Sequence, residues 1–424
     1  MIQYDDFLER LSSIPIFDTH EHLQKEEQAL EKEIDFFDLL IPYICDDLLS
    51  SGMSKEEWEY INNKTIDLEK RWEVYSKYHQ FIENGGYFLT VKRIFKQYGL
   101  NEIDLKNIKK ISESLSLKRK AGYYSSTLKD LGIKKVNVIL GDYKVDEGFD
   151  NFSFPQIPTV SKFCPTCFED LEKIMQYCDC SIKTTEDIKV SIGKLFGIYK
   201  RNNIHALKIG SGYVRELDFM EPDEIKAQNQ LDAIYNGDKC TLNSRQIDNK
   251  YIDYLKVKDL DDFVIWNIME EAQKLNMIIY IHTGLHAWNF NVPRRSHCDS
   301  LVTVISKFPN LKFVLLHCSY PYVEDALLLA KYYPNVFLNL TWVCVIDRIK
   351  AKEIINRIFE FIPLNKVALF GGDCFHIESV YGHLQIVKEI LAQCLFERIE
   401  LGNISSEKAI EIATMLLGGT SEIE

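Results

Sequence analysis

The chain has 424 residues, 46% of them hydrophobic and 27% charged, which is the composition of a globular protein. Its formal net charge is −13, from 63 acidic and 50 basic residues, which argues against a nucleic-acid partner because phosphate backbones attract basic surfaces. The sequence has no apolar stretch of about 18 residues and no signal-peptide core near its start, so we expect a cytoplasmic protein without a membrane partner.

The first informative segment is an apolar run over residues 14–22 that includes two histidines one residue apart, His20 and His22. Side chains at positions i and i+2 of a strand point to the same face, so both imidazoles can reach one metal ion. A helix would place them about 200° apart. An isolated His-x-His pair is more often incidental, so a metal site requires further ligands.

The next segment, residues 23–120, is charged and aromatic and has no strand pattern. It is too long for a simple connection between a strand and a helix. We therefore predict a helical insertion after the first strand.

From residue 121 onward, helical and strand patterns alternate. Strand patterns lie within 121–142 and at 156–163, 203–210, 277–282, 312–317, 335–341 and 366–370. Helical patterns lie at 261–275, 298–308, 322–333, 351–362, 377–400 and 405–417. This alternation predicts an α/β fold with a parallel sheet, and the continuous apolar strands predict that both sheet faces are covered.

With the opening strand the count is eight, which favours a (β/α)8 barrel, or TIM barrel. A doubly wound open sheet is the alternative, but no glycine-rich phosphate loop follows any strand. The predicted domains are a barrel formed by 1–22 and 121–424, and the helical insertion 23–120, which we expect to cap the barrel mouth.

Residues of the type that binds metals stand at four strand ends. In addition to the opening pair, His282 and His317 each end a strand, and Asp373 follows the last strand after two glycines. The carboxyl ends of all strands meet at one mouth of a barrel, and imidazoles with a carboxylate suit a divalent metal such as zinc. Taken singly, each histidine could be a hydrogen-bonded core residue and the aspartate a turn or cap residue.

This arrangement resembles the amidohydrolase superfamily. The phrases Ile-His-Thr-Gly, Leu-Leu-His-Cys and Phe-Gly-Gly-Asp are similar to its amidohydrolase-2 branch, and the long insertion is similar to the uronate isomerase group. The resemblance implies a distorted barrel in which His20, His22, His282 and Asp373 bind the metal. It implies that His317 is either a further ligand or a group that polarises the substrate.

Lys208 lies in the fourth strand, where some members of the superfamily carry a carboxylated lysine that bridges two metals. We favour an unmodified lysine that pairs with substrate charge or with a nearby carboxylate. The expected cofactor is therefore one divalent ion, with zinc favoured, or two ions if Lys208 is carboxylated.

The segments that follow the strands also supply candidates for substrate binding. Adjacent arginines predict recognition of a carboxylate or phosphate, because guanidinium groups bind oxyanions in a bidentate manner; a solvated basic patch is the alternative. Aromatic residues near the mouth can instead pack against the insertion. The candidates are Tyr213, Arg215, His286, Trp288, Arg294, Arg295 and Trp342.

Four cysteines lie within a short stretch: Cys164, Cys167, Cys178 and Cys180. They could form a structural zinc site, but the second pair has an unusual spacing. We favour reduced thiols, as expected for a chain without an export signal.

The leading functional hypothesis is a metal-dependent hydrolase that acts on a small, anionic substrate. Asp373 would move the proton of the attacking water, and His317 or the metal would polarise the carbonyl group. The alternatives are a uronate isomerase-type reaction on a sugar acid, a metal-dependent decarboxylation, and a catalytically silent barrel that acts as a binding protein. A homo-oligomer is left open.

Overall fold

The structure is a computed structural model that describes residues 2–41, 43–146, 153–237 and 257–418. The strands of these ranges form two parallel sheets, of order β1-β2-β3 and β4-β5-β6-β7-β8. Their bounds are β1 Ile16–Glu21, β2 Ile133–Ile139, β3 Gln156–Ile157, β4 Ala206–Ile209, β5 Ile278–His282, β6 Lys312–Leu316, β7 Val336–Asn339 and β8 Val367–Ala368.

Backbone contacts join the edges of the two sheets. The amide of Lys208 in β4 donates to the carbonyl of Pro158 just after β3, at 2.8 Å. At the other seam, the amide of Thr19 in β1 donates to the carbonyl of Phe370 after β8, at 3.2 Å. This second seam continues past the strands, where the amide of Asp373 donates to the carbonyl of His20 at 2.8 Å and the amide of His22 donates to the carbonyl of Cys374 at 2.9 Å. The predicted distorted α/β barrel is confirmed, with less backbone pairing at the two seams than within each sheet.

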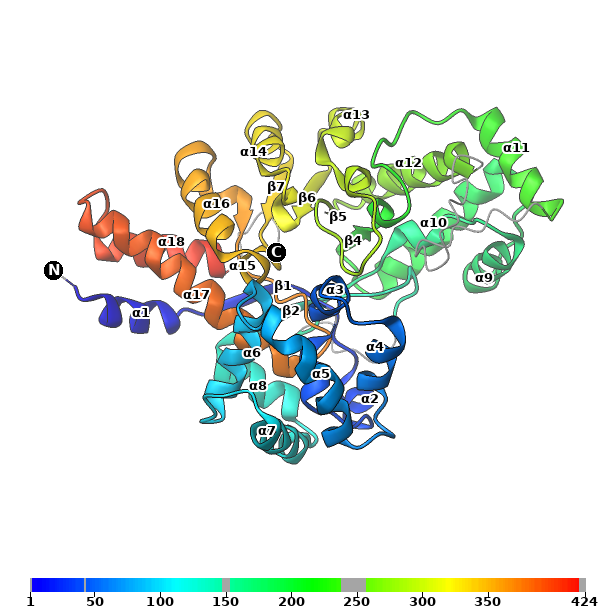
Figure 1. Cartoon of the computed structure of the whole chain (residues 1–424). Coiled ribbons are helices and arrows are strands. Elements are labelled where there is room, and N and C mark those ends of the chain that lie inside the picture. Colours follow the sequence, from blue (N-terminus) through cyan, green and yellow to red (C-terminus); the bar gives the residue numbers. More distant parts are fainter. Residues whose placement is uncertain (1, 42, 147–152, 238–256, 419–424) are drawn as a thin grey trace.

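Helices cover the outside of the strands, and in Figure 1 α12, α13, α14 and α16 lie along the outer side of β4–β7. None of the helices in the described residues is long and apolar enough to cross a membrane. The helices of the barrel are α1 Tyr4–Ser12, α8 Tyr123–Leu131, α9 Phe168–Cys178, α10 Thr185–Arg201, α11 Glu224–Tyr235, α12 Lys258–Lys274, α13 Val302–Lys307, α14 Val323–Tyr332, α15 Val343–Ile346, α16 Arg348–Phe361, α17 Ile377–Glu400 and α18 Ser406–Leu417.

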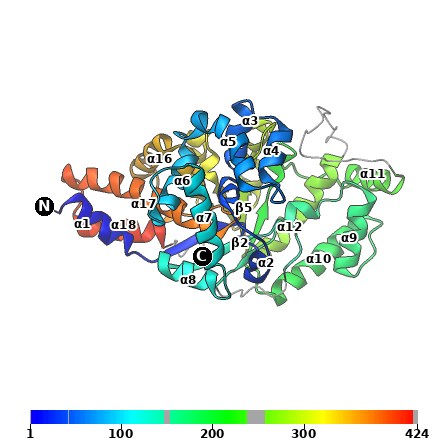
Figure 2. The same ribbon diagram turned by 60° about the horizontal axis from the view of Figure 1, so that its bottom comes forward.

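Residues 23–120 are helical, and their described part contains no strand. Figures 1 and 2 show these helices, in blue and cyan, gathered beside β1 and β2. That they form a separate domain that caps the mouth stays a prediction. The helices are α2 Glu26–Leu30, α3 Ile44–Ser50, α4 Lys55–Asn62, α5 Leu68–Ile82, α6 Gly86–Gln97 and α7 Leu105–Lys118.

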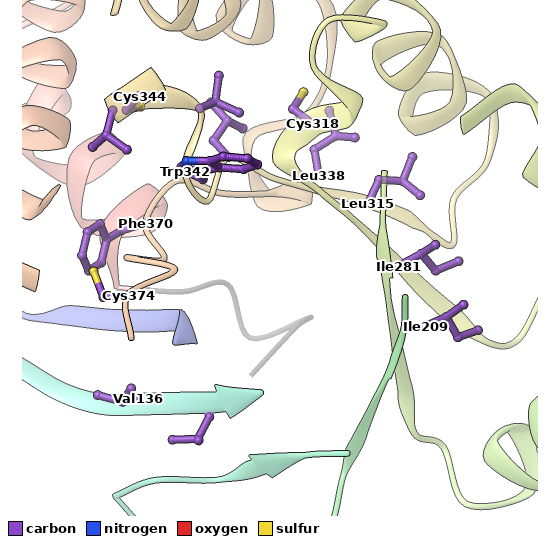
Figure 3. Close-up of a cluster of buried hydrophobic side chains, with 14 of the residues drawn as sticks. Val136, Ile209, Ile281, Leu315, Cys318, Leu338, Trp342, Cys344, Phe370 and Cys374 are labelled. Carbon is purple, nitrogen blue, oxygen red and sulfur yellow. The ribbon is translucent and has the colours of Figure 1, made fainter. Parts of the chain in front are cut away.

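The two faces of the strands bury different clusters. Ile209, Ile281, Leu315 and Leu338 pair in register across β4–β7 and form one apolar row, which Figure 3 shows. They belong to the large hydrophobic core that also contains residues of the surrounding helices. Together with the cluster on the opposite face, this row explains why the strands have continuous apolar sequences, since both of their faces are covered.

The opposite face carries residues toward the functional site. Tyr280, Val314 and Phe337 form part of a second buried cluster, and Tyr280 pairs with Lys208 across β4 and β5. Side chains two positions apart share a face of a strand, so His282 extends the row of Tyr280. Strand alternation therefore brings His282 and Lys208 to the same face near the carboxyl ends.

A close backbone contact fixes the helical segment to the barrel, which gives a test of the fold. A Cβ atom on Gly86, the first residue of α6, would lie 2.1 Å from the carbonyl oxygen of Ile346 in α15. We expect Gly86→Ala to lower the free energy of unfolding by about 1–3 kcal/mol, as overpacking does. The measurement is urea unfolding followed by circular dichroism.

Gly193→Ala is the matched control, because a Cβ atom at this helical position meets nothing within 4 Å. It should leave stability unchanged or raise it by up to about 1 kcal/mol, since alanine favours a helix. Equal midpoints and slopes for Gly86→Ala and the wild type would contradict the contact.

Candidate metal centre

Three of the predicted ligands form a compact cluster. The Nε2 atoms of His20 and His22 lie 3.3 and 3.2 Å from Oδ1 of Asp373. One ligand atom from each of the three residues lies within 4.8 Å of the others. His20 and Asp373 are buried, whereas His22 is partly exposed. The strand end and the segment after β8 therefore bring two imidazoles and a carboxylate to one point.

The two glycines before Asp373 make this approach sterically allowed. A Cβ atom on Gly371 would lie 2.0 Å from Oγ1 of Thr341 and 2.9 Å from Cβ of His20. A Cβ atom on Gly372 would lie 2.0 Å from a carboxylate oxygen of Glu21. The phrase Phe-Gly-Gly-Asp is thus required by the close approach of the last strand to β1.

His282 and His317 form a second pair of imidazoles in the site. Nδ1 of His282 and Nε2 of His317 lie 3.1 Å apart. The remaining nitrogens face backbone carbonyl oxygens: His282 Nε2 lies 2.9 Å from that of Leu285, and His317 Nδ1 lies 3.0 Å from that of Thr341. Because carbonyl oxygens only accept hydrogen bonds, both rings are assigned N–H groups there, and two lone pairs then face each other.

Three of the histidines, His20, His282 and His317, are uncharged at neutral pH. Burial lowers the pKa values of His20 and His282 well below their usual range and that of His317 to about 4. Burial also acts to raise the pKa of Asp373, but His20 and His22 hold it well below its usual value. The site therefore presents neutral imidazoles around an ionised carboxylate, which is the protonation state that metal ligands require.

Two observations indicate that these residues fit a metal ion. Neither ring nitrogen of the buried His20 has a hydrogen-bond partner among the described residues. The facing lone pairs of His282 and His317 repel each other unless a cation lies nearby. Nitrogen and carboxylate donors in this combination suit zinc or a similar divalent ion.

Lys208 is buried beside this cluster, with 5% of its surface exposed. Burial lowers the pKa of its ammonium group to about 7, although the charge of Asp373 acts to raise it. No hydrogen bond or ion pair joins its Nζ atom to the described residues. Lys208 is thus a buried amine that lacks a partner of opposite charge.

A cavity of about 630 Å³ opens onto the cluster. Both tryptophans and one tyrosine predicted near the mouth are part of its wall. The predicted residues that line the cavity are His20, His22, Lys208, Tyr213, His282, Trp288, His317, Trp342 and Asp373.

Several further residues of the cavity wall were not predicted. The hydroxyl of Tyr43, from the segment before α3, donates to the backbone carbonyl of Asp373 at 2.5 Å. The ring of Phe375 stacks on that of His22, with centroids 5.2 Å apart. The position of Phe375, two residues after Asp373, was a usable signal. Tyr43 has no such signal, because its place depends on how residues 23–120 pack.

The predicted arginines lie elsewhere, and within the described residues no arginine lines the cavity. Arg294 is 81% exposed and pairs with Glu216 on the surface. Arg215 is buried, but its guanidinium contacts Asp262 at 2.6 Å and Asp261 at 3.2 Å, so its charge is already balanced. Arg295 does not line the cavity either. These positions do not favour the predicted contacts with substrate.

His286 has a local structural contact. Its Nε2 atom lies 2.8 Å from the carbonyl oxygen of Gly212, and its ring stacks on His282. It is buried and does not line the cavity. His286 therefore packs behind the site, and its predicted contact with substrate is not favoured.

The four neighbouring cysteines do not gather as candidate ligands in the structure. In the part of the chain that the structure describes, the single group of three or more candidate ligands is His20, His22 and Asp373. Cys164, Cys167, Cys178 and Cys180 are free thiols. That these cysteines are reduced stays a prediction.

Comparisons with known proteins agree with the fold. Residues 251–403 match the Amidohydro_2 amidohydrolase family model. The protein fluG of Emericella nidulans is 28% identical over 166 residues, which are 38% of this chain and 19% of that protein's length. The chain thus covers only a small part of this curated relative.

Two solved structures share the fold almost from end to end. The glucuronate isomerase of Caulobacter crescentus has a TM-score of 0.73 and 13% identity, over 98% of this chain and 92% of its own. The uronate isomerase of Thermotoga maritima has a TM-score of 0.73 and 14% identity, over 97% and 95%. Because 97–98% of the chain is covered, most of the helical segment 23–120 belongs to the shared fold. Residues 251–403 thus resemble an amidohydrolase family, and the chain as a whole has the fold of these two uronate isomerases.

Proposed function

We propose that this protein is a metal-dependent hydrolase that acts on a small substrate with an anionic group. The observation that carries the proposal is the convergence of His20, His22 and Asp373 at a cavity that His282, His317 and Lys208 also line. A cavity of this size suits a small molecule.

His20, His22, His282 and Asp373 would hold one divalent ion, for which zinc is our candidate. A bound divalent ion supplies Lewis acidity, which lowers the pKa of water and polarises a carbonyl group. In the tautomer assigned to His317, Nε2 carries a lone pair and cannot donate a hydrogen bond to a substrate. We therefore favour His317 as a further ligand over a group that polarises the substrate.

Asp373 is the candidate proton carrier. Its low pKa keeps the carboxylate ionised at neutral pH, so it can accept a proton from the attacking water. Once protonated, the same carboxyl group can pass the proton to the leaving group. The hydrogen bond from Tyr43 to its backbone carbonyl restrains the segment that carries it.

Lys208 is the candidate partner of the anionic group. It is the buried cationic side chain of the cavity wall, and an anion placed beside it would restore the charge balance that burial removes. With the arginines directed elsewhere, the role that we predicted for guanidinium groups passes to this ammonium group.

A second candidate is isomerisation of a sugar acid. It is favoured by the fold shared with two uronate isomerases, which extends over 97–98% of this chain. The reaction moves a proton between adjacent carbons, and Asp373 could carry that proton as it would in hydrolysis. The two candidates therefore share residues and differ in substrate.

The first prediction concerns metal content. After zinc loading and desalting, we expect about one equivalent in the wild type and a large loss in His20→Asn, because removing an imidazole lowers metal affinity steeply. Elemental analysis gives the readout, and Arg294→Ala should match the wild type because Arg294 is exposed. Less than about half an equivalent in the wild type would instead support a catalytically silent barrel.

The second prediction concerns Asp373→Asn. The amide cannot accept the proton, so turnover should fall by about a thousandfold, while the histidines keep most of the metal. Metal-loaded wild type and variant are compared on carboxylate-bearing esters, amides and lactones, and on D-glucuronate and D-galacturonate. Hydrolysis products support the first candidate and ketose formation supports the second; release of carbon dioxide would indicate a decarboxylase. An active variant would exclude the role of Asp373.

The third prediction concerns pH. The pKa of Lys208 is about 7, so its cationic form is complete below that pH and is lost above it. For an anionic substrate, kcat/KM should therefore fall by up to about tenfold per pH unit above 7, since this parameter reports the free enzyme. Lys208→Gln should lower kcat/KM and remove this alkaline limb. Lys162→Gln, which changes an exposed lysine of the same cavity, should keep it.

A further inference from the structure

The segment between β5 and the short turn Pro293–Ser296 forms one wall of the cavity. Trp288, Asn289 and Asn291 of this segment line the cavity, as does Tyr43, the residue just before α3. One wall thus combines a barrel loop with the helical segment that follows β1.

This loop has an unusual backbone conformation. Trp288 and Phe290 have φ angles of 72° and 66°, in the left-handed region that side chains disfavour by about 1–2 kcal/mol per residue. The side-chain amide of Asn291 donates to the carbonyls of Ala287, at 2.9 Å, and Trp288. A conformation of this cost requires contacts that hold it.

Contacts from outside the loop come from the barrel, where the backbone amide of Ala287 donates to the Tyr213 hydroxyl at 3.2 Å, and from Asp46 in α3. The Asn289 side-chain amide donates to the backbone carbonyl of Asp46 at 3.4 Å. The Asp46 carboxylate faces the backbone amide of Trp288, which acts to lower the pKa of that carboxyl group. Both contacts of Asp46 link the cavity wall to the helical segment across the mouth.

The surroundings of Asp46 disfavour the ionised form of its carboxyl group. Its Oδ1 atom is buried and has no hydrogen-bond partner among the described residues. Burial and the neighbouring charge of Asp47 raise the pKa of Asp46 to about 7. Stability alone does not explain a carboxyl group here, because an uncompensated polar atom is costly to bury.

We propose that Asp46 is a positioning residue that holds Trp288 in the cavity wall, and that Trp288 thereby limits the size of the substrate. Trp288 is part of the lining, so we expect truncation of its side chain to enlarge the cavity and loss of the Asp46 contact to release the loop that carries it. The size limit rests on the proposed function in one respect, because it takes from that proposal that the cavity binds an anionic ligand.

The positioning role is tested by hydrogen exchange. In Asp46→Ala, the backbone amides of residues 285–292 should exchange about tenfold faster, which corresponds to the loss of one hydrogen bond to a charged group. Asp46→Asn keeps an acceptor oxygen and should restore most of the protection. Asp47→Ala removes the adjacent, exposed carboxylate and should behave as the wild type. Equal exchange in Asp46→Ala and the wild type would overturn the proposal.

The size limit is tested by binding of two aromatic carboxylates, benzoate and 2-naphthoate, to the zinc-loaded protein by calorimetry. We expect the wild type to prefer benzoate, and Trp288→Ala and Asp46→Ala to lower the ratio of the two affinities by about tenfold, as for a relieved steric contact. Asp47→Ala should keep the wild-type ratio. An unchanged ratio in Trp288→Ala, or no binding by the wild type, would overturn the size limit.

These measurements do not require turnover. If no substrate is hydrolysed or isomerised but exchange and binding change as expected, the proposed function fails and the positioning role stands. If turnover is found but the amides of Asp46→Ala exchange as those of the wild type do, the proposed function stands and the positioning role fails.

Discussion

The structure of the site depends on one buried charge, the carboxylate of Asp373. An ionised carboxylate in a protein interior costs several kcal/mol unless cations or hydrogen bonds compensate it. Here its neighbours are imidazoles that burial keeps neutral, together with an amine whose own charge burial disfavours. The negative charge of Asp373 is therefore compensated only when a cation binds among these residues. This requirement explains why two rings direct lone pairs toward each other.

The metal-binding set His20, His22, His282, His317 and Asp373 forms the floor of the site. This floor was predictable from the sequence because it is fixed by local periodicity and by the geometry of parallel strands. Strand alternation determines which face His282 and Lys208 share, and the barrel brings all the carboxyl ends of the strands together. His317 shows the limit of this reasoning. Its strand ends at Leu316, and His317 has a φ angle of 61°, so it reaches the site through a left-handed turn that an apolar pattern does not indicate.

The wall of the site was less predictable because a position close to a strand end does not determine the direction in which a side chain points. Arg215 follows β4 directly, yet it turns toward the acidic residues at the start of α12, where opposite charges compensate its burial. Arg294 extends into solvent. Conversely, Tyr43 and Asp46 lie far from the predicted ligands in sequence. Only the packing of residues 23–120 against the barrel brings Tyr43 to the cavity and Asp46 to the loop that lines it. Sequence patterns describe such long-range docking poorly, since it depends on the shapes of two packed surfaces.

This division between floor and wall bears on the reaction. Hydrolysis and isomerisation both need a metal-binding set and one carboxyl group that accepts and returns a proton, and the floor offers both. The floor residues alone therefore do not determine which bond of the substrate is broken or formed. That decision rests with residues that determine which ligand fits and how it lies, namely Lys208 at the buried end and the aromatic residues of the wall. The wall residue Trp288 has a costly backbone conformation and is bound to a different part of the chain, so its position is determined by the fold as a whole. A barrel of this fold can thus keep its metal-binding residues while its loops and insertion change the ligand on which they act.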